Sequence, residues 1–336
     1  MGNFSDWQAG DDGRLGPVLL DCLRAAIAAP SIHNTQPWRF RPRADGIDVF
    51  ADHTRRLGVI DPGGREVLIS VGAALFNLRV AVLAHGRTPL TRLMPASDEP
   101  DRIAQVAFGR PAPVSDTVRM LAQAIPRRHT NRRPFSAASV PSEVLDDIVK
   151  AATVEGGQLA VADPGAREAV LSLVRIAERQ ARSEPGYWRE LGDWTGQSAY
   201  RRDGVPPEAY GPWSAMETVP IRDFGLIEPA RRRRVETFEA EPTIAVLYST
   251  ADSPREWVKV GQALERTLLT ATVRGVATTL MTQPLEIPQL RSLLADSAAE
   301  LVPQAIVRFG YGPPSPATLR RPLEEVVDGL MPKVPH

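Results

Sequence analysis

The sequence has a single cysteine, Cys22, among its 336 residues. One thiol excludes an intrachain disulfide and any metal site built from several thiolates. The five histidines show no spacing typical of metal ligands, so no metal site is predicted. Only three of the 40 basic residues are lysines, a bias towards arginine that is typical of high-GC coding sequences.

The chain also has no excess of charge of either sign. Its 40 basic and 40 acidic residues give a formal net charge of zero, which offers no support for a nucleic-acid or membrane-surface partner. The four arginines at 231 to 234 are followed by Glu236 and Glu239. This pattern favours a salt-bridged helix face over a nucleic-acid or NADPH-phosphate site. No apolar run is expected to span a membrane, and the N-terminus lacks a signal-peptide pattern. We therefore expect a soluble, cytoplasmic protein.

Helical and strand patterns alternate along the chain, which indicates an α+β or α/β class with helices covering a sheet. Apolar spacing predicts helices at residues 19 to 27, 65 to 85, 115 to 124, 141 to 153, 165 to 182, 254 to 274 and 287 to 293. Strands are predicted at residues 38 to 52 (a hairpin), 102 to 109, 158 to 163, 242 to 248, 277 to 282 and 303 to 310.

Three pairs of segments repeat in the same order without gaps. They are residues 20 to 31 with 145 to 156, 71 to 86 with 260 to 275, and 104 to 117 with 305 to 318. One such pair could be shared helical amphipathicity, but three in order indicate a tandem duplication. The predicted copies are residues 1 to 124 and 125 to 336.

The second copy is longer than the first, mainly through an insert at about residues 183 to 240. Long irregular segments with aromatic residues are often functional lids, whereas disordered segments are poor in aromatics. The candidate lid residues are Tyr187, Trp188, Trp194, Tyr210 and Trp213. A surface loop that packs on the neighbouring copy is an equally good interpretation of this insert.

Three motifs carry a resemblance to a known family. "AAIAAPSIHNTQPWRF" at residues 25 to 40 resembles the helix-end motif of the FMN-dependent nitroreductase superfamily. "IPRRHTNRRPFSAASVPSEVLDDIVKAA" from residue 125 is similar to its N-terminal Arg-x-Ser-x-Arg element, and "FGYGPPSPATLRRPLEEVV" from residue 309 to its C-terminal end. The fused form most resembles the Acg-type branch. The resemblance implies an α+β fold of two copies, each a mainly antiparallel sheet with packed helices, that together mimic the family homodimer.

In that family each FMN site is built from both subunits, and the resemblance implies which residues form it here. The second copy would supply the arginine element with threonine in place of serine, the end of a strand, and a C-terminal arginine. The first copy would supply the Pro-Ser-x-x-Asn element. The implied cofactor residues are Arg128, Thr130, Arg132, Leu280, Met281, Thr282, Gln283, Arg320, Pro30, Ser31, Ile32 and Asn34.

The reciprocal site is incomplete in both of its halves. Where the second copy would need Pro-Ser-x-x-Asn, it has Val154-Glu155-Gly156-Gly157, and residues 1 to 18 contain only Arg14. The resemblance therefore implies one FMN per chain, lying between the copies of a monomer that mimics a dimer. No catalytic acid or base is predicted, because the flavin itself carries the chemistry.

Two functions remain open at this stage. The first is an oxidoreductase that passes a hydride from NAD(P)H through FMN to a small-molecule acceptor such as a nitroaromatic or a quinone. The second is an FMN-sequestering, storage or sensing protein whose flavin is covered by the insert and turns over little.

Overall fold

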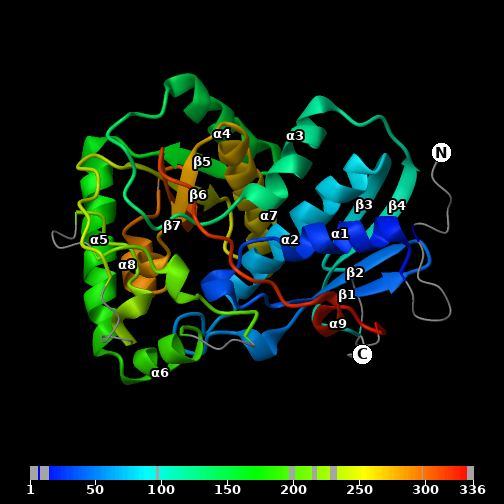
Figure 1. Cartoon of the computed structure of the whole chain (residues 1–336), viewed down its shortest axis with the longest axis horizontal. Helices are drawn as coiled ribbons and strands as arrows, with labels where there is room; N and C mark the ends of the chain where they lie inside the picture. The colour runs from blue at the N-terminus through cyan, green and yellow to red at the C-terminus, as the bar shows by residue number, and fades with distance from the viewer. Residues whose placement is uncertain are drawn as a thin grey trace.

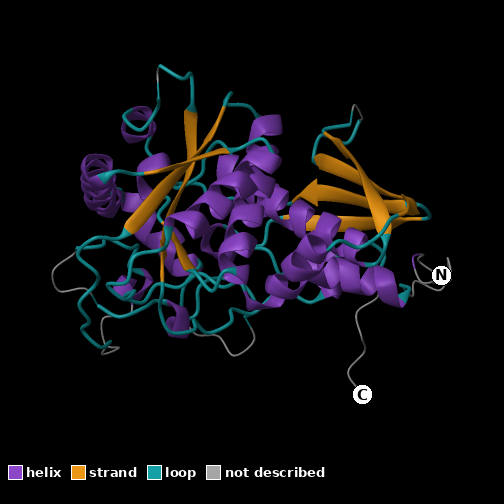
Figure 2. Cartoon of the chain, turned by 90° about the horizontal axis from the view of Figure 1, so that it is seen from above, coloured by secondary structure: helices purple, strands orange, loops and turns teal. Residues whose placement is uncertain are grey.

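The computed structural model describes residues 7, 15–95, 98–196, 201–213, 218–227, 233–296 and 298–330. Within them, two four-stranded sheets lie on either side of a central pair of long helices (Figure 2). The central helices are α2 (Arg65–Ala84) and α7 (Pro254–Val273). Each begins where its sequence pattern predicts, at Arg65 after a left-handed Gly64 and at Pro254 after the cap Ser253.

Both sheets are antiparallel and share one strand order, which confirms the α+β class. In each of them the strands run first, second, fourth, third along the sheet. The first sheet contains β1 (Trp38–Arg43), β2 (Gly46–Ala51), β4 (Arg102–Pro111) and β3 (Arg87–Leu93). The second contains β5 (Gln158–Val161), β6 (Thr243–Ser249), β8 (Val302–Gly310) and β7 (Ala277–Leu280).

The predicted helices are confirmed, and two short ones were missed. The remaining helices are α1 (Pro17–Ile27), α3 (Asp116–Ala124), α4 (Ser142–Val154), α5 (Pro164–Ser183), α6 (Pro185–Asp193), α8 (Pro288–Ser292) and α9 (Leu323–Val326). The missed helices are α6 and α9. α9 packs against β1 of the first sheet, and the backbone N–H of Asp328 donates to the Phe40 carbonyl at 2.8 Å (Figure 1). The end of the chain therefore lies on the sheet formed by its beginning.

The central helices cross at a pair of glycines, Gly72 of α2 and Gly261 of α7. A Cβ on Gly72 would come closer than 3.0 Å to the Val258 carbonyl oxygen, and one on Gly261 would do the same at the Ile69 carbonyl. The two contacts are equivalent, since Gly72 aligns with Gly261 in the repeat and Ile69 aligns with Val258. Reciprocal contacts of this kind are the pattern of a twofold interface.

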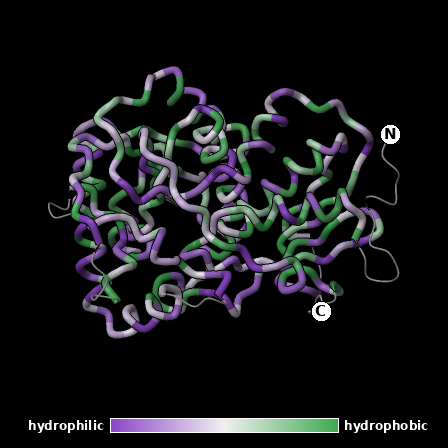
Figure 3. The backbone as a smooth tube through the Cα atoms, in the orientation of Figure 1, coloured by the Kyte–Doolittle hydropathy of each residue, from purple (hydrophilic) through white to green (hydrophobic). Residues whose placement is uncertain are grey.

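Helix α2 corrects one expectation from the sequence. It is long and apolar enough to cross a membrane by length and composition, although no such run was expected. However, 83% of its most apolar window is buried inside the protein, where it runs through the middle of the molecule (Figure 3). Burial between two sheets accounts for its composition, as in the core helices of other globular proteins.

The arginine run at 231 to 234 does not open a helix, contrary to the prediction. Residues 233–240 are irregular, and Arg233 forms an ion pair with Asp223 at 2.6 Å. Glu239 instead pairs at 2.5 Å with Arg308, which is fully buried over the Phe135 ring. A buried carboxylate partner holds this segment in an extended path. Arg231 and Arg232 lie outside the described residues.

Candidate functional site

A cavity of about 1070 Å³, counted to its open mouth, lies where the two halves of the molecule meet. It is lined by the segment after α1, the first turns of α2, residues 128–132, the end of β7 and residues 316–320. Segments far apart in the sequence thus converge on one space. Apolar and polar side chains together line this space, as they do in cavities that hold a small molecule or cofactor.

The structure brings together all but one of the predicted cofactor residues at this cavity. Those that line it are Pro30, Ser31, Ile32, Asn34, Arg128, Thr130, Arg132, Leu280, Thr282, Gln283 and Arg320. Met281 does not, because it is fully buried in a core cluster with Val170 of α5. Side chains of an extended chain alternate between two sides, so Leu280 and Thr282 face the cavity while Met281 faces away.

The segment after α1 has an unusual backbone. His33, Asn34 and Gln36 have φ angles of 45°, 55° and 51°, a region that residues other than glycine rarely adopt. Two hydroxyl groups hold this conformation. Ser31 Oγ accepts from the Gln36 N–H at 2.9 Å, and Ser70 Oγ of α2 accepts from the Ile32 N–H at 3.2 Å. Backbone strain of this kind is concentrated at ligand-binding sites.

Asn34 lines the cavity, but its amide is already hydrogen-bonded within the protein. Its Nδ2 donates to the Gly204 carbonyl of the insert at 2.9 Å, and its Oδ1 accepts from Arg320 at 3.1 Å. Gln36 is held in the same way, since its Nε2 donates to the Arg202 carbonyl and its Oε1 accepts from the Arg321 N–H. The small polar groups of this loop therefore join three segments of the chain around the cavity.

Buried Arg128 and half-buried Arg320 meet at the end of α1, and both donate to the Ala28 carbonyl, at 3.4 and 3.1 Å. Neither Nε atom has a hydrogen bond in the described part of the chain, although Arg128 Nε forms an ion pair with Glu265 at 3.5 Å. Burial, together with the charge of Arg128, lowers the pKa of Arg320 to about 9, while Glu265 opposes the shift. Two crowded, incompletely paired guanidinium groups make this end of the cavity suitable for an anion.

Arg128 and Arg132, four residues apart, do not lie on one helix face. The segment is irregular, and Thr130 forms a bridge with Thr278 of β7. Arg132 lies instead over the Phe224 ring at 4.7 Å and donates to the Ala209 carbonyl at 3.0 Å. The tertiary contacts of the insert therefore separate the two arginines.

His33, which the sequence marks as a possible flavin donor but more often a solvated loop residue, lies against a third arginine. Arg222 Nη1 is 3.0 Å from His33 Nε2, and the imidazole packs edge-on against Phe224 at 4.9 Å. Burial, followed by the charges of Arg222 and Arg132, holds the pKa of His33 well below its usual value. The ring is therefore neutral, with Nε2 as acceptor and Nδ1 carrying the proton.

The five aromatic lid candidates do not line the cavity. Tyr187, Trp194 and Tyr210 pack in a cluster with Leu57 and Ile60. Trp188 and Trp213 are 38% and 46% exposed. The insert residues that do line the cavity are Val205, Ile221, Arg222 and Phe224. No spacing or motif distinguishes these four in the sequence, and only their packing places them at the site.

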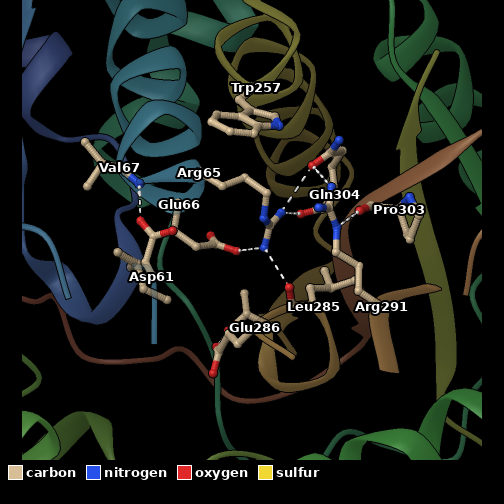
Figure 4. Close-up of polar contacts among 12 residues, drawn as sticks. Asp61, Arg65, Glu66, Val67, Trp257, Leu285, Glu286, Arg291, Pro303 and Gln304 are labelled. Atoms are coloured by element: carbon tan, nitrogen blue, oxygen red, sulfur yellow. Dashed lines mark hydrogen bonds and ion pairs between the residues drawn. The ribbon is translucent and has the colours of Figure 1, made fainter. Parts of the chain in front are cut away.

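A buried ionic network underlies the cavity beside α2 (Figure 4). Arg65 donates to the Gln304 carbonyl at 2.7 Å and pairs with Glu66, which lines the cavity. Burial raises the pKa of Glu66 to about 7, with Arg65 opposing the shift and Asp61 adding to it. The sequence gave no signal for this network, because Arg65 and Glu66 resemble the start of an ordinary helix.

Glu265 gives a pH-dependent prediction. It is fully buried beside Arg128 at 3.5 Å, and burial raises its pKa to about 7 despite Arg128. The folded state then binds this proton more tightly than the unfolded chain, so stability is lost as the pH rises from about 4.5 to about 7. We expect Glu265→Gln to reduce that loss by up to about 3 kcal/mol in urea unfolding followed at several pH values.

Glu143→Gln, at an exposed position of helix α4, is the matched control. It should leave the dependence of stability on pH as in the unsubstituted protein. Parallel pH profiles for the unsubstituted protein and Glu265→Gln would contradict the prediction.

The chain matches a known family and curated relatives. The model of the nitroreductase family matches residues 125–311. The NAD(P)H nitroreductase acg of Mycobacterium tuberculosis is 31% identical over 316 residues, covering 92% of this chain and 95% of that protein. A second protein of that organism, also named an NAD(P)H nitroreductase, is 33% identical over 318 residues, covering 91% of this chain and 90% of its own length.

Solved structures show a weaker similarity. The FMN- and NADPH-dependent nitroreductase NfnB of sphigopyxis sp. strain HMH is 17% identical with a TM-score of 0.38, covering 62% of this chain and 97% of that one. A nitroreductase with bound FMN from Bacteroides fragilis is 15% identical with a TM-score of 0.33, covering 64% of this chain and 98% of that one. The family match over more than half of the chain and the relatives over nine-tenths of it are sufficient: this chain belongs to the nitroreductase family.

Proposed function

We propose that the chain is an FMN-dependent oxidoreductase that holds one FMN in the cavity between its two halves. The observation that carries the proposal is the pair Arg128 and Arg320, two guanidinium groups that meet at one end of that cavity beside one carboxylate, that of Glu265. A flavin phosphate would supply the missing negative charge, and charge-assisted hydrogen bonds to it are the strongest available to arginine.

The rest of the cavity fits a flat, amphipathic ring system. Pro30 and Ile32 offer apolar surface at the strained loop after α1, and Leu280 lies at the end of β7. Ser31 keeps the loop in place through its bond to the Gln36 N–H, so the backbone can approach a planar ligand closely. Phe224 and Val205 add apolar surface from the insert and exclude water from that side.

Bound there, FMN would supply hydride chemistry, accepting a hydride from NAD(P)H and passing it to a nitroaromatic or quinone-like acceptor. The role of the protein is to bind, orient and desolvate. The neutral His33 could offer its Nδ1 proton as a hydrogen-bond donor, since this buried atom has no partner in the described part of the chain. No side chain is required as the catalytic acid or base.

We also propose that the fold arose by tandem duplication and that the chain is a monomer mimicking a dimer. The shared strand order of the two sheets and the reciprocal contacts of Gly72 and Gly261 support this. Copies at 1 to 124 and 125 to 336 place the central helices in different copies. A cytoplasmic location remains a prediction from the sequence.

A second candidate function is the sequestering of FMN with little turnover. It is favoured by the hydrogen bonds that hold the insert over the site. Gln36 donates a hydrogen bond to the Arg202 carbonyl, and Asn34 donates one to the Gly204 carbonyl. Glu190 of α6 accepts from the Val59 and Ile60 N–H groups at 2.8 and 2.9 Å. A segment held at so many points would open slowly.

Sedimentation velocity, with flavin absorbance recorded beside protein absorbance, tests the proposal. We expect a single species of the chain's own 36.7 kDa carrying one FMN. Anaerobic NADPH should then bleach the flavin rapidly if the chain is a reductase, whereas a flavin that stays oxidised supports sequestering. Two flavins per chain, none after reconstitution, or an obligate dimer would refute the composite site.

A further inference from the structure

A second cavity of about 820 Å³ adjoins the first. The two share Arg132, Ile221 and Arg222 in their linings, so these residues form the boundary between them. We call the second cavity the arginine chamber, defined by the guanidinium groups of Arg132, Arg175, Arg179, Arg182, Arg222 and Arg233.

One side of the chamber is a single face of α5. Arg175, Glu178, Arg179 and Arg182 follow one another at intervals of three, one and three residues, which places them on one side of a helix. The opposite side of α5 carries Val170 and its apolar neighbours, which pack into the core. The helix is therefore fixed by its apolar side and presents its arginines to the insert.

The chamber carries an excess of positive charge. Among the described residues, its lining has six arginines and two carboxylates, Glu178 and Asp223. Asp223 pairs with Arg233, and Glu178 lies 3.4 Å from Arg182. Burial, the largest effect, raises the pKa of Glu178, while the charges of Arg222 and Arg182 oppose the shift. Cations gathered in a concave space attract an anion, and arginine binds phosphate groups with paired hydrogen bonds.

The boundary with the first cavity shows the same excess. Burial and the charge of Arg222 lower the pKa of Arg132 to about 10. Arg222 is buried with Glu286 as its partner, and Glu286 lies outside the chamber lining. A ligand with its reactive end in the first cavity could therefore extend past Arg132 and Arg222 and place its phosphates in the chamber.

We propose that the arginine chamber binds the phosphate-bearing adenosine half of the dinucleotide reductant and selects NADPH over NADH. This inference rests on the proposed oxidoreductase function. NADPH differs from NADH by a 2′-phosphate, a dianion that the guanidinium groups of α5 would recognise. Trp213, whose exposed ring also lines the chamber, offers a surface for the adenine.

The test uses a non-reducing probe, adenosine 2′,5′-bisphosphate, compared with 5′-AMP by titration calorimetry on the purified full chain. We expect the bisphosphate to bind at least about tenfold more tightly and to weaken with added salt. Arg179→Gln should remove most of that preference. Arg179 is exposed on α5, so this substitution should leave the fold and the flavin content unchanged.

Arg189→Gln is the control, since Arg189 is an exposed arginine on the neighbouring helix α6 and does not line the chamber. The Arg189→Gln variant should prefer the bisphosphate over 5′-AMP as strongly as the unsubstituted chain does. Equal affinity for the two nucleotides, an equal loss in both variants, or displacement of the bisphosphate by an equal concentration of inorganic phosphate would overturn the proposal.

Failure of this inference can be told apart from failure of the proposed function. If the flavoprotein oxidises NADH and NADPH equally and does not prefer the bisphosphate, the oxidoreductase function stands. The proposed role of the arginine chamber in selecting NADPH is then refuted. If the chain binds the bisphosphate through Arg179 but holds no flavin, the arginine chamber stands as a nucleotide-binding site. The proposed oxidoreductase function is then refuted.

Discussion

Arg128→Gln is expected to weaken FMN binding by about 10- to 150-fold, so that the variant is purified largely without flavin. Arg128 is buried at the end of the cavity beside Glu265, with Arg320 bonded to the same Ala28 carbonyl. Removing one cation from this pair removes charge-assisted hydrogen bonds to the phosphate, each of which contributes roughly 1.5–3 kcal/mol. Fluorescence titration of the flavin-free protein measures the change.

Two further variants separate flavin binding from folding. Arg127→Gln removes an exposed neighbouring arginine that bonds only to the Gln123 carbonyl, and it should bind FMN normally. Arg128→Gln leaves Glu265 buried without its nearest cation, which could destabilise the fold. The double variant Arg128→Gln/Glu265→Gln removes that problem and should still bind FMN weakly. Normal FMN affinity in the double variant would contradict the phosphate role.

Gly261→Ala is expected to lower the free energy of unfolding by about 1–3 kcal/mol, as measured by urea denaturation. An alanine Cβ there would lie 2.8 Å from the Gly72 Cα and closer still to the Ile69 carbonyl. The helices α2 and α7 would have to move apart at the centre of the molecule. This cost outweighs the gain of about 1 kcal/mol that alanine normally brings to a helix. Gly72→Ala should cost a similar amount, because its contacts mirror those of Gly261.

The matched control is Gly192→Ala in α6. A Cβ at Gly192 would meet nothing closer than the Ile227 side chain at 3.7 Å. The same substitution should therefore stabilise the protein slightly, through the unfolded chain and helix propensity. If all three variants changed stability alike, the close crossing of α2 and α7 would not be what limits these positions.

The secondary structure was largely predictable, and the exceptions have physical causes. β3 was missed because it is an edge strand with a proline, Pro89, and half-exposed side chains, so it lacks the alternation of a buried strand. α6 was missed because Pro185, Gly186 and Gly192 suggest a loop. Pro185 is in fact at the first helical position, where proline is well tolerated.

The candidate site was predictable only where a motif marks it. The loop from Pro30, the arginines Arg128 and Arg320, and the end of β7 were all identified by motif, and the structure places them at one cavity. The insert had two equal interpretations, a lid of aromatic side chains over a flavin and a surface loop packed on the neighbouring copy. Tyr187, Trp194 and Tyr210 pack against Leu57 and Ile60, as the second interpretation predicts, while Phe224 and Arg222 line the cavity.

The sequence by itself determined the helices, most strands, the repeat and the motif residues, because these depend on local spacing and on short strings of residue types. Only the tertiary structure decided which of these groups meet. It showed that α2 is a buried core helix, that Arg128 and Arg132 point to different partners, and that α5 turns its arginines towards the insert. Such contacts join residues far apart in the sequence, as with Arg132 and Ala209, which are 77 positions apart. They depend on how apolar faces pack together, which local spacing does not encode.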